Sequence, residues 1–76
     1  MFDRITSDPA ILGGKPIIRG TRISVEIILE WIASGASRDD ILREHPHLIA
    51  ADVEQALDYA ASTVRNEVRI TAEVPG

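Results

Sequence analysis

Cysteine is absent from this sequence, so a disulfide framework and a thiolate metal site are both excluded. No run of 18 consecutive apolar residues is present either, and we therefore expect no membrane-spanning helix. The first residues, Met1 to Arg4, lack the basic and then apolar pattern of a secretory signal peptide. Together these absences favour a protein of the reducing cytoplasm.

Recognisable catalytic motifs are also lacking. Gly14-Lys15 matches the end of a phosphate-binding P-loop, but that loop needs Gly and Ser or Thr where this chain has Pro9 and Pro16. His45 and His47 stand among scattered carboxylates and do not form a convincing zinc set. No Ser or Thr has a His and a carboxylate at a readable spacing. We expect no enzymatic activity, cofactor, metal or small-molecule substrate.

The chain has 76 residues, which is enough for one domain with a small core. Yet 45% of its residues are apolar, a high share for a small soluble monomer. We therefore expect further burial in a homodimer or against another protein. A compact monomer is the alternative.

Charge is spread unevenly around a net value of −4. Residues 1–23 hold four basic side chains against two acidic ones, whereas residues 24–63 hold two basic against eight acidic. An acidic chain is a poor general binder of polyanions. If nucleic acid is bound, we expect the basic N-terminal segment or a partner protein to make the contact.

Turn-forming residues divide the basic N-terminal segment into short pieces. Gly13-Gly14 permits a sharp turn, and Pro16 favours extended backbone before it. Ile17-Ile18 and Arg22-Ile23 are β-prone pieces around Arg19-Gly20-Thr21, which predicts a tight hairpin. Such an arm would present Lys15, Arg19 and Arg22.

Three helices are predicted after the arm, at about residues 25–34, 38–44 and 50–64. Ser24 is a good N-cap for the first, and Ser37 with Asp40 resembles a capping box for the second. The fold class is therefore mainly α: a helix-turn-helix-like three-helix domain with a short N-terminal β-hairpin arm. The single domain divides into an arm (1–23), a trihelical core (24–64) and a tail (65–76).

The first helix carries apolar residues on more than one side. Its inward stripe has helical spacing, and Ile27 and Trp31 add a second apolar flank that predicts a dimer or partner surface, unless the arm covers it. The third helix has one apolar stripe, which predicts its buried face. This stripe consists of Val53, Ala56, Leu57, Ala60 and Val64.

The tail allows two interpretations. Val68, Ile70, Ala72 and Val74 alternate with polar residues, as in a strand, and such a segment would suit strand addition to a partner through Val68 and Ile70. Alternatively, the third helix continues to about Ile70.

Nucleic-acid binding through the third helix meets a difficulty. In a helix-turn-helix the early residues of this helix face the bases, and here only Gln55 is a convincing adenine reader. Asp52, Glu54 and Asp58 would repel phosphates. The candidate nucleic-acid contacts are therefore Gln55 and the arm cations Lys15, Arg19 and Arg22. Alternatively, these cations pair with the acidic helices of the same chain.

Several motifs of the chain occur, in this order, in a known bacterial family. They are Ile5-Thr6-Ser7-Asp8-Pro9, Gly13-Gly14-Lys15-Pro16, Ile18-Arg19-Gly20-Thr21-Arg22-Ile23, Ile28-Leu29, Gly35 and His45-Pro46-His47-Leu48. Over about residues 3–62 the chain resembles the domain of unknown function family numbered 433. Its members are regarded as VapB-like antitoxins with a helix-turn-helix-type fold, often encoded beside a PIN-like ribonuclease toxin.

The resemblance implies an antitoxin of a type II toxin–antitoxin module that binds a PIN-like toxin and its own operator DNA. The alternatives are a stand-alone DNA-binding regulator and a protein-interaction module without a nucleic-acid role. The chain departs from the family pattern at Ile49, where Ser or Thr usually caps the third helix, and at Ala51, where an acid is common. Loss of the cap would cost about 1 kcal/mol.

Overall fold

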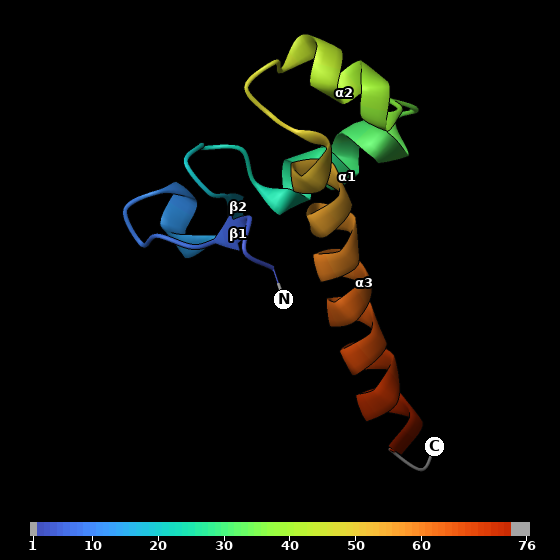
Figure 1. The fold of residues 1–76 in the computed structure, drawn as a ribbon. Helices are drawn as coiled ribbons and strands as arrows, with labels where there is room; N and C mark the ends of the chain where they lie inside the picture. Colours follow the sequence, from blue (N-terminus) through green and yellow to red (C-terminus); the bar gives the residue numbers. More distant parts are fainter. Residues whose placement is uncertain (1, 74–76) are drawn as a thin grey trace.

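The computed structural model describes residues 2–73, with side chains for residues 2–66. The elements, in chain order, are β1 (Ile5–Thr6), the 3-10 turn η1 (Leu12–Gly14), β2 (Ile17–Ile18), α1 (Val25–Ala33), α2 (Arg38–Glu44) and α3 (Ala50–Glu73) (Figure 1). The predicted mainly helical fold with a small antiparallel strand pair is confirmed. Within residues 2–73 no helix combines the length and the hydropathy needed to cross a membrane.

The strand that pairs with Ile17–Ile18 is not the predicted one. Ile17–Ile18 is a strand as predicted, but it pairs antiparallel with Ile5–Thr6. The expectation of a strand at Arg22-Ile23 was wrong, because that side contributes only an isolated bridge between Ile17 and Ser24. The tight turn itself is present, with Gly20 at φ 80°. The partner was missed because strand pairing between distant segments leaves no local signal.

The first two helices begin at the predicted caps. The Ser24 hydroxyl accepts a hydrogen bond from the Ile27 N–H at 3.0 Å. Ser37 and Asp40 form the predicted capping box, because the Ser37 hydroxyl accepts from the Asp40 N–H at 3.1 Å and the Asp40 carboxylate accepts from the Ser37 N–H at 2.9 Å. The bounds of α2 match the prediction, and α1 ends one residue early at Ala33.

The core lies where β2, α1, α2 and the first half of α3 meet. Its buried members are Ile18, Val25, Ile28, Ile41, Leu48, Val53 and Ala56. The predicted buried stripe of α3 is confirmed at Val53 and Ala56 but is wrong at Leu57 and Val64, which are 42% and 56% exposed. Leu57 lies about 100° around α3 from the buried Ala56, and Val64 lies about two turns farther along the helix, toward the end that extends past the core.

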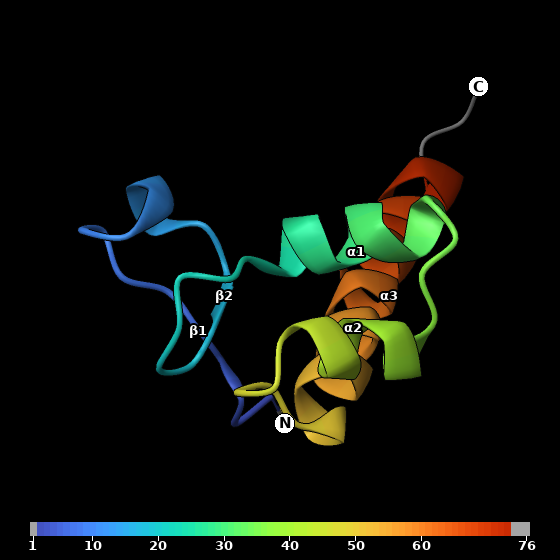
Figure 2. The same cartoon turned by 90° about the horizontal axis from the view of Figure 1, so that it is seen from above.

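Over residues 65–73 the helical interpretation of the tail is correct, although α3 ends at Glu73 and not at about Ile70; Val74 of the predicted strand lies outside the described residues. No Gly or Pro interrupts the sequence between Ala50 and Glu73, and adding a residue to an existing helix costs far less than starting one. Figure 1 shows the C-terminal part of α3 extending past the other elements, and Figure 2 shows α1 and α2 around its first half.

The capping box of α2 predicts a dependence of stability on acid. Hydrogen bonding to the Ser37 backbone, and then to the Arg43 side chain, lowers the pKa of Asp40 from 3.8 to about 2. A carboxyl group with a lowered folded-state pKa contributes stability that is full above its unfolded pKa and is lost as the pH falls through the folded one. The Asp40→Asn variant should therefore lose less unfolding free energy than the wild type between about pH 4 and pH 2.

Urea denaturation followed by circular dichroism, at steps of half a pH unit, measures this effect. Above about pH 5 the difference between the two proteins should stay constant, which serves as the internal control. Parallel curves from pH 5 to pH 2 would contradict the role of Asp40.

Candidate functional site

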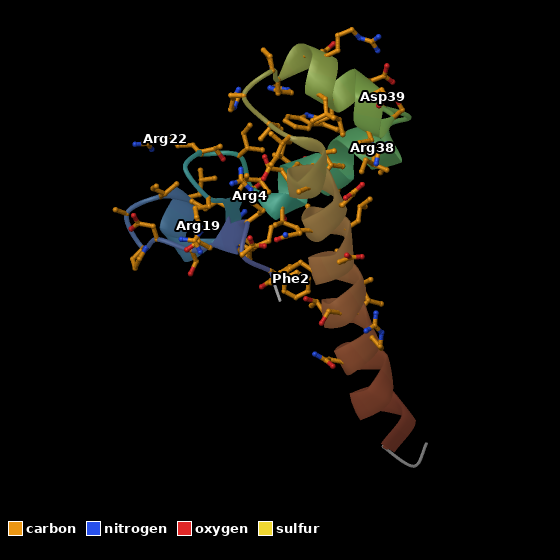
Figure 3. All side chains as sticks on the ribbon, viewed as in Figure 1. Phe2, Arg4, Arg19, Arg22, Arg38 and Asp39 are labelled. Carbon is orange, nitrogen blue, oxygen red and sulfur yellow. The ribbon has the colours of Figure 1, made fainter. Side chains whose placement is uncertain are left out.

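The N-terminal residues are fastened to α3 by a set of polar contacts (Figure 3). The Arg4 Nε donates to the Asp52 carboxylate at 2.5 Å, and the Arg4 backbone N–H donates to the Gln55 Oε1 at 2.8 Å. The Gln55 Nε2 in turn donates to the Asp3 carboxylate at 2.6 Å. This hydrogen bond lowers the pKa of Asp3, and the bond to Asp52 raises the pKa of Arg4.

An aromatic contact continues the same row along α3. The rings of Phe2 and Tyr59 meet edge to face, with centroids 5.5 Å apart. Residues 2, 3 and 4 thus contact Tyr59, Gln55 and Asp52, which follow one another at helical spacing on one face of α3. The arm is therefore packed on the helical core over its first residues.

Asp52 is the most buried polar residue of this contact. Its side chain is 0% exposed, whereas that of Arg4 is 32% exposed. The second carboxylate oxygen accepts from the Ile49 N–H at 2.9 Å, which satisfies a donor at the start of α3. Asp52 thus supplies half of a capping box although Ile49 has no side-chain oxygen. Nothing in the sequence signals the pairing of Asp52 with Arg4.

The four predicted nucleic-acid contacts do not form one open surface. Lys15 donates to Glu26 on α1 at 2.9 Å, which raises the pKa of Lys15, and Arg19 donates to the Asp3 carbonyl at 2.9 Å. Gln55 is held by residues 3 and 4. Arg22 is exposed and points away from α3 in Figure 3. Lys15 therefore forms the ion pair with an acidic helix of the same chain that the sequence left open as an alternative.

Two of the predicted partner contacts belong to α1 and two to α3. Ile27 and Trp31 are half-buried on α1, and the Trp31 ring stacks on His45 with centroids 4.5 Å apart. Beside this stack is a pocket of about 310 Å³ that Asp40 also lines. Val68 and Ile70 belong to the helical backbone of α3, but their side chains lie outside the described residues.

An open, mainly apolar groove lies between the arm, α1 and α3, and we call it the α1–α3 groove. It has a volume of about 370 Å³. Apolar side chains form most of its walls, namely Pro16, Val25, Leu29, Tyr59, Ala60 and Val64. Lys15, Glu26 and Thr63 complete the lining, and the first two form the ion pair described above. The sequence did not predict the groove, because its walls come from segments far apart in the chain.

Within the part of the chain that the structure describes, no group of three or more His, Asp or Glu side chains could hold an ion. His45 and His47 lie with ring centroids 6.2 Å apart, and His45 is already stacked on Trp31. The apolar lining of the α1–α3 groove is of a kind that packs against other apolar surfaces.

The fold and the groove define a small helical domain with a packed N-terminal arm and an open apolar groove. Residues 5–60 match the family model DUF433, described as a protein of unknown function, and the chain belongs to this family. It is 38% identical over 72 residues to the uncharacterized protein y4eO of Sinorhizobium fredii (strain NBRC 101917 / NGR234). That match covers 93% of this chain and 33% of the relative, so the chain spans about one third of the relative's length.

A solved structure has the same fold. The crystal structure of a DUF433 member protein from Anabaena variabilis ATCC 29413 superposes with a TM-score of 0.78 at 30% sequence identity. The match covers 93% of this chain and 70% of that one. The arm and the three helices are thus a shared arrangement within the family.

Removal of the buried carboxylate should destabilise the domain. Asp52→Ala leaves the Arg4 guanidinium and the Ile49 N–H without their acceptor. We expect the free energy of unfolding to fall by about 1–3 kcal/mol, as for other buried hydrogen-bond partners. Arg4 keeps access to water, so the loss should stay below that for a fully buried ion pair.

Glu54→Ala is the matched control, because it removes a carboxylate two residues away whose ion pair with Arg38 is exposed. Urea denaturation of both variants makes the comparison. Equal losses from the two substitutions would contradict the structural role of Asp52.

Proposed function

We propose that this protein is the antitoxin of a bacterial type II toxin–antitoxin module. It acts by binding a PIN-like ribonuclease toxin and performs no catalytic step of its own. The resemblance to VapB-like antitoxins supplies the class of partner, and the α1–α3 groove supplies the observation that carries the proposal. The toxin inserts apolar side chains into this groove.

The groove has the features of a protein-binding surface. It is open to solvent and mainly apolar, and exposed apolar surface of this kind marks sites of association. Val64 in its wall is 56% exposed, so the surface remains uncovered by the described part of the chain. An amphipathic helix or an extended segment of the toxin would bury it.

The distribution of charge favours a protein partner over DNA for the isolated chain. Lys15 and Arg19 already make contacts within the chain, and the exposed side of α3 near its start carries Glu54 and Asp58. These carboxylates would repel phosphates in a helix-turn-helix docking mode. Operator binding is therefore assigned to the complex with the toxin, in which Arg22 remains open for a phosphate contact.

Co-expression with the product of the neighbouring gene, which the proposal expects to be a PIN-like ribonuclease, tests the proposal. The wild-type protein should restore growth and co-purify with the toxin. Thr63→Arg places a long charged side chain on the groove wall and should weaken binding by about tenfold or more, since a charge is costly to bury in an apolar site. Thr63 is exposed, so the variant should fold.

Asn66→Arg is the matched control, because it adds the same side chain at an exposed position of α3 outside the groove. It should bind the toxin like the wild type, as measured by isothermal titration calorimetry. The absence of any complex with the wild-type protein would refute the antitoxin role. Equal binding by the Thr63→Arg variant would instead refute the groove as the docking site.

A further inference from the structure

A second exposed apolar feature follows α3 itself, and we call it the α3 stripe. It consists of Leu57, Ala61 and Val64, which are all exposed. Their spacing of four and then three residues keeps them on one side of the helix, in the pattern of a helix–helix seam. Leu57 and Val64 are 42% and 56% exposed, although both are large and apolar.

The α3 stripe leads into the part of the helix that the rest of the chain does not support. Figure 1 shows α3 extending beyond the arm, α1 and α2, and the backbone stays helical to Glu73. Residues 61–73 would form a helix about 20 Å long. A helix of this length is marginal in water without packing on an apolar face. Packing of the stripe against the surface of another molecule would stabilise this part of the helix.

The charges beside the α3 stripe indicate which surface this is. Asp58 follows Leu57 and Arg65 follows Val64, so the two charged residues are one heptad apart on the same flank. Both are exposed, and neither forms an ion pair within residues 2–66. The flank thus carries an acidic group three residues before Ala61 and a basic group four residues after it.

We propose that α3 pairs antiparallel with α3 of a second copy of this chain, around a twofold axis near Ala61. Antiparallel packing places Leu57 against the partner subunit's Val64 and Asp58 against the partner subunit's Arg65. The twofold axis repeats each contact, which makes the surface self-complementary. The small side chain of Ala61 at the axis allows the two backbones to approach closely.

A parallel pair would be less favourable. In a parallel pair the twofold axis runs along the seam, so the flanks that carry Asp58 and Arg65 in the two copies lie on opposite sides of it and these charges cannot pair with each other. A partner of unrelated sequence has no reason to match this spacing of opposite charges. Charge complementarity therefore favours a second copy, in the antiparallel orientation.

The dimer is independent of the antitoxin proposal. At 100° per residue, Leu57 and Thr63 lie about 120° apart around α3, so the stripe and the far wall of the groove face different directions. The two features share only Val64. Toxin binding can therefore fail while the dimer persists, and the reverse also holds.

Charge exchange across the pair tests the proposal. Sedimentation equilibrium should show a dimer for the wild type. Asp58→Arg and Arg65→Asp should each weaken it by about tenfold, because each replaces two attractions by two repulsions. The double variant should recover the wild-type association within about threefold, since it restores opposite charges. Asn66→Arg, on the side of α3 away from the stripe, should leave the dimer unchanged.

Cross-linking then tests the orientation, and the absence of native cysteine makes it clean. Leu57→Cys and Val64→Cys proteins, mixed and oxidised, should form the mixed disulfide in preference to either self-linked species. Both sites are exposed, so circular dichroism should show folded variants. A wild type that is monomeric at all concentrations, a double variant that stays dissociated, or mainly self-linked products would each overturn the antiparallel dimer.

Discussion

The buried carboxylate of Asp52 is the constraint on which the arrangement depends. A carboxylate that is 0% exposed must have partners, and Arg4 and the Ile49 N–H provide them. This contact joins α3 to Arg4, which lies 48 positions earlier in the sequence. The contact brings β1 beside the core, where β1 pairs with β2. A turn then connects β2 to α1. One side of the α1–α3 groove is thus positioned by an ion pair outside it.

The small size of the domain also explains why the basic residues of the arm make contacts within the chain. A domain of 76 residues has a small core, so polar contacts between distant segments carry a larger share of its organisation. Arg4 donates a hydrogen bond to a carboxylate of α3, and Lys15 donates one to a carboxylate of α1. Arg19 donates a hydrogen bond to the backbone carbonyl of residue 3. Cations used in this way would have to leave their partners before they could reach a phosphate. The excess of acidic residues on the helices adds to that cost.

Sequence reasoning succeeded where the signal is local. Ser24 and the Ser37–Asp40 capping box fix where α1 and α2 begin, and each needs only residues within three positions. It failed where the answer depends on distant segments, as for β1 and for the partner of Asp52. The exposure of Leu57 and Val64 belongs to the same class, because helical spacing defines a face but not how far its cover extends. The groove and the α3 stripe could therefore not be predicted from the sequence alone.

The high apolar content of the chain can now be divided by location. Part of it fills the core, and part lines the α1–α3 groove and the α3 stripe, where water still reaches it. Anything that binds the folded state alone stabilises it by mass action. A surface seated on the stripe would therefore stabilise the helical backbone of residues 61–73 as well as cover Leu57 and Val64. The stability of this part of α3 and the association of the protein would then be thermodynamically coupled. This coupling would account for a long α3 on so small a core.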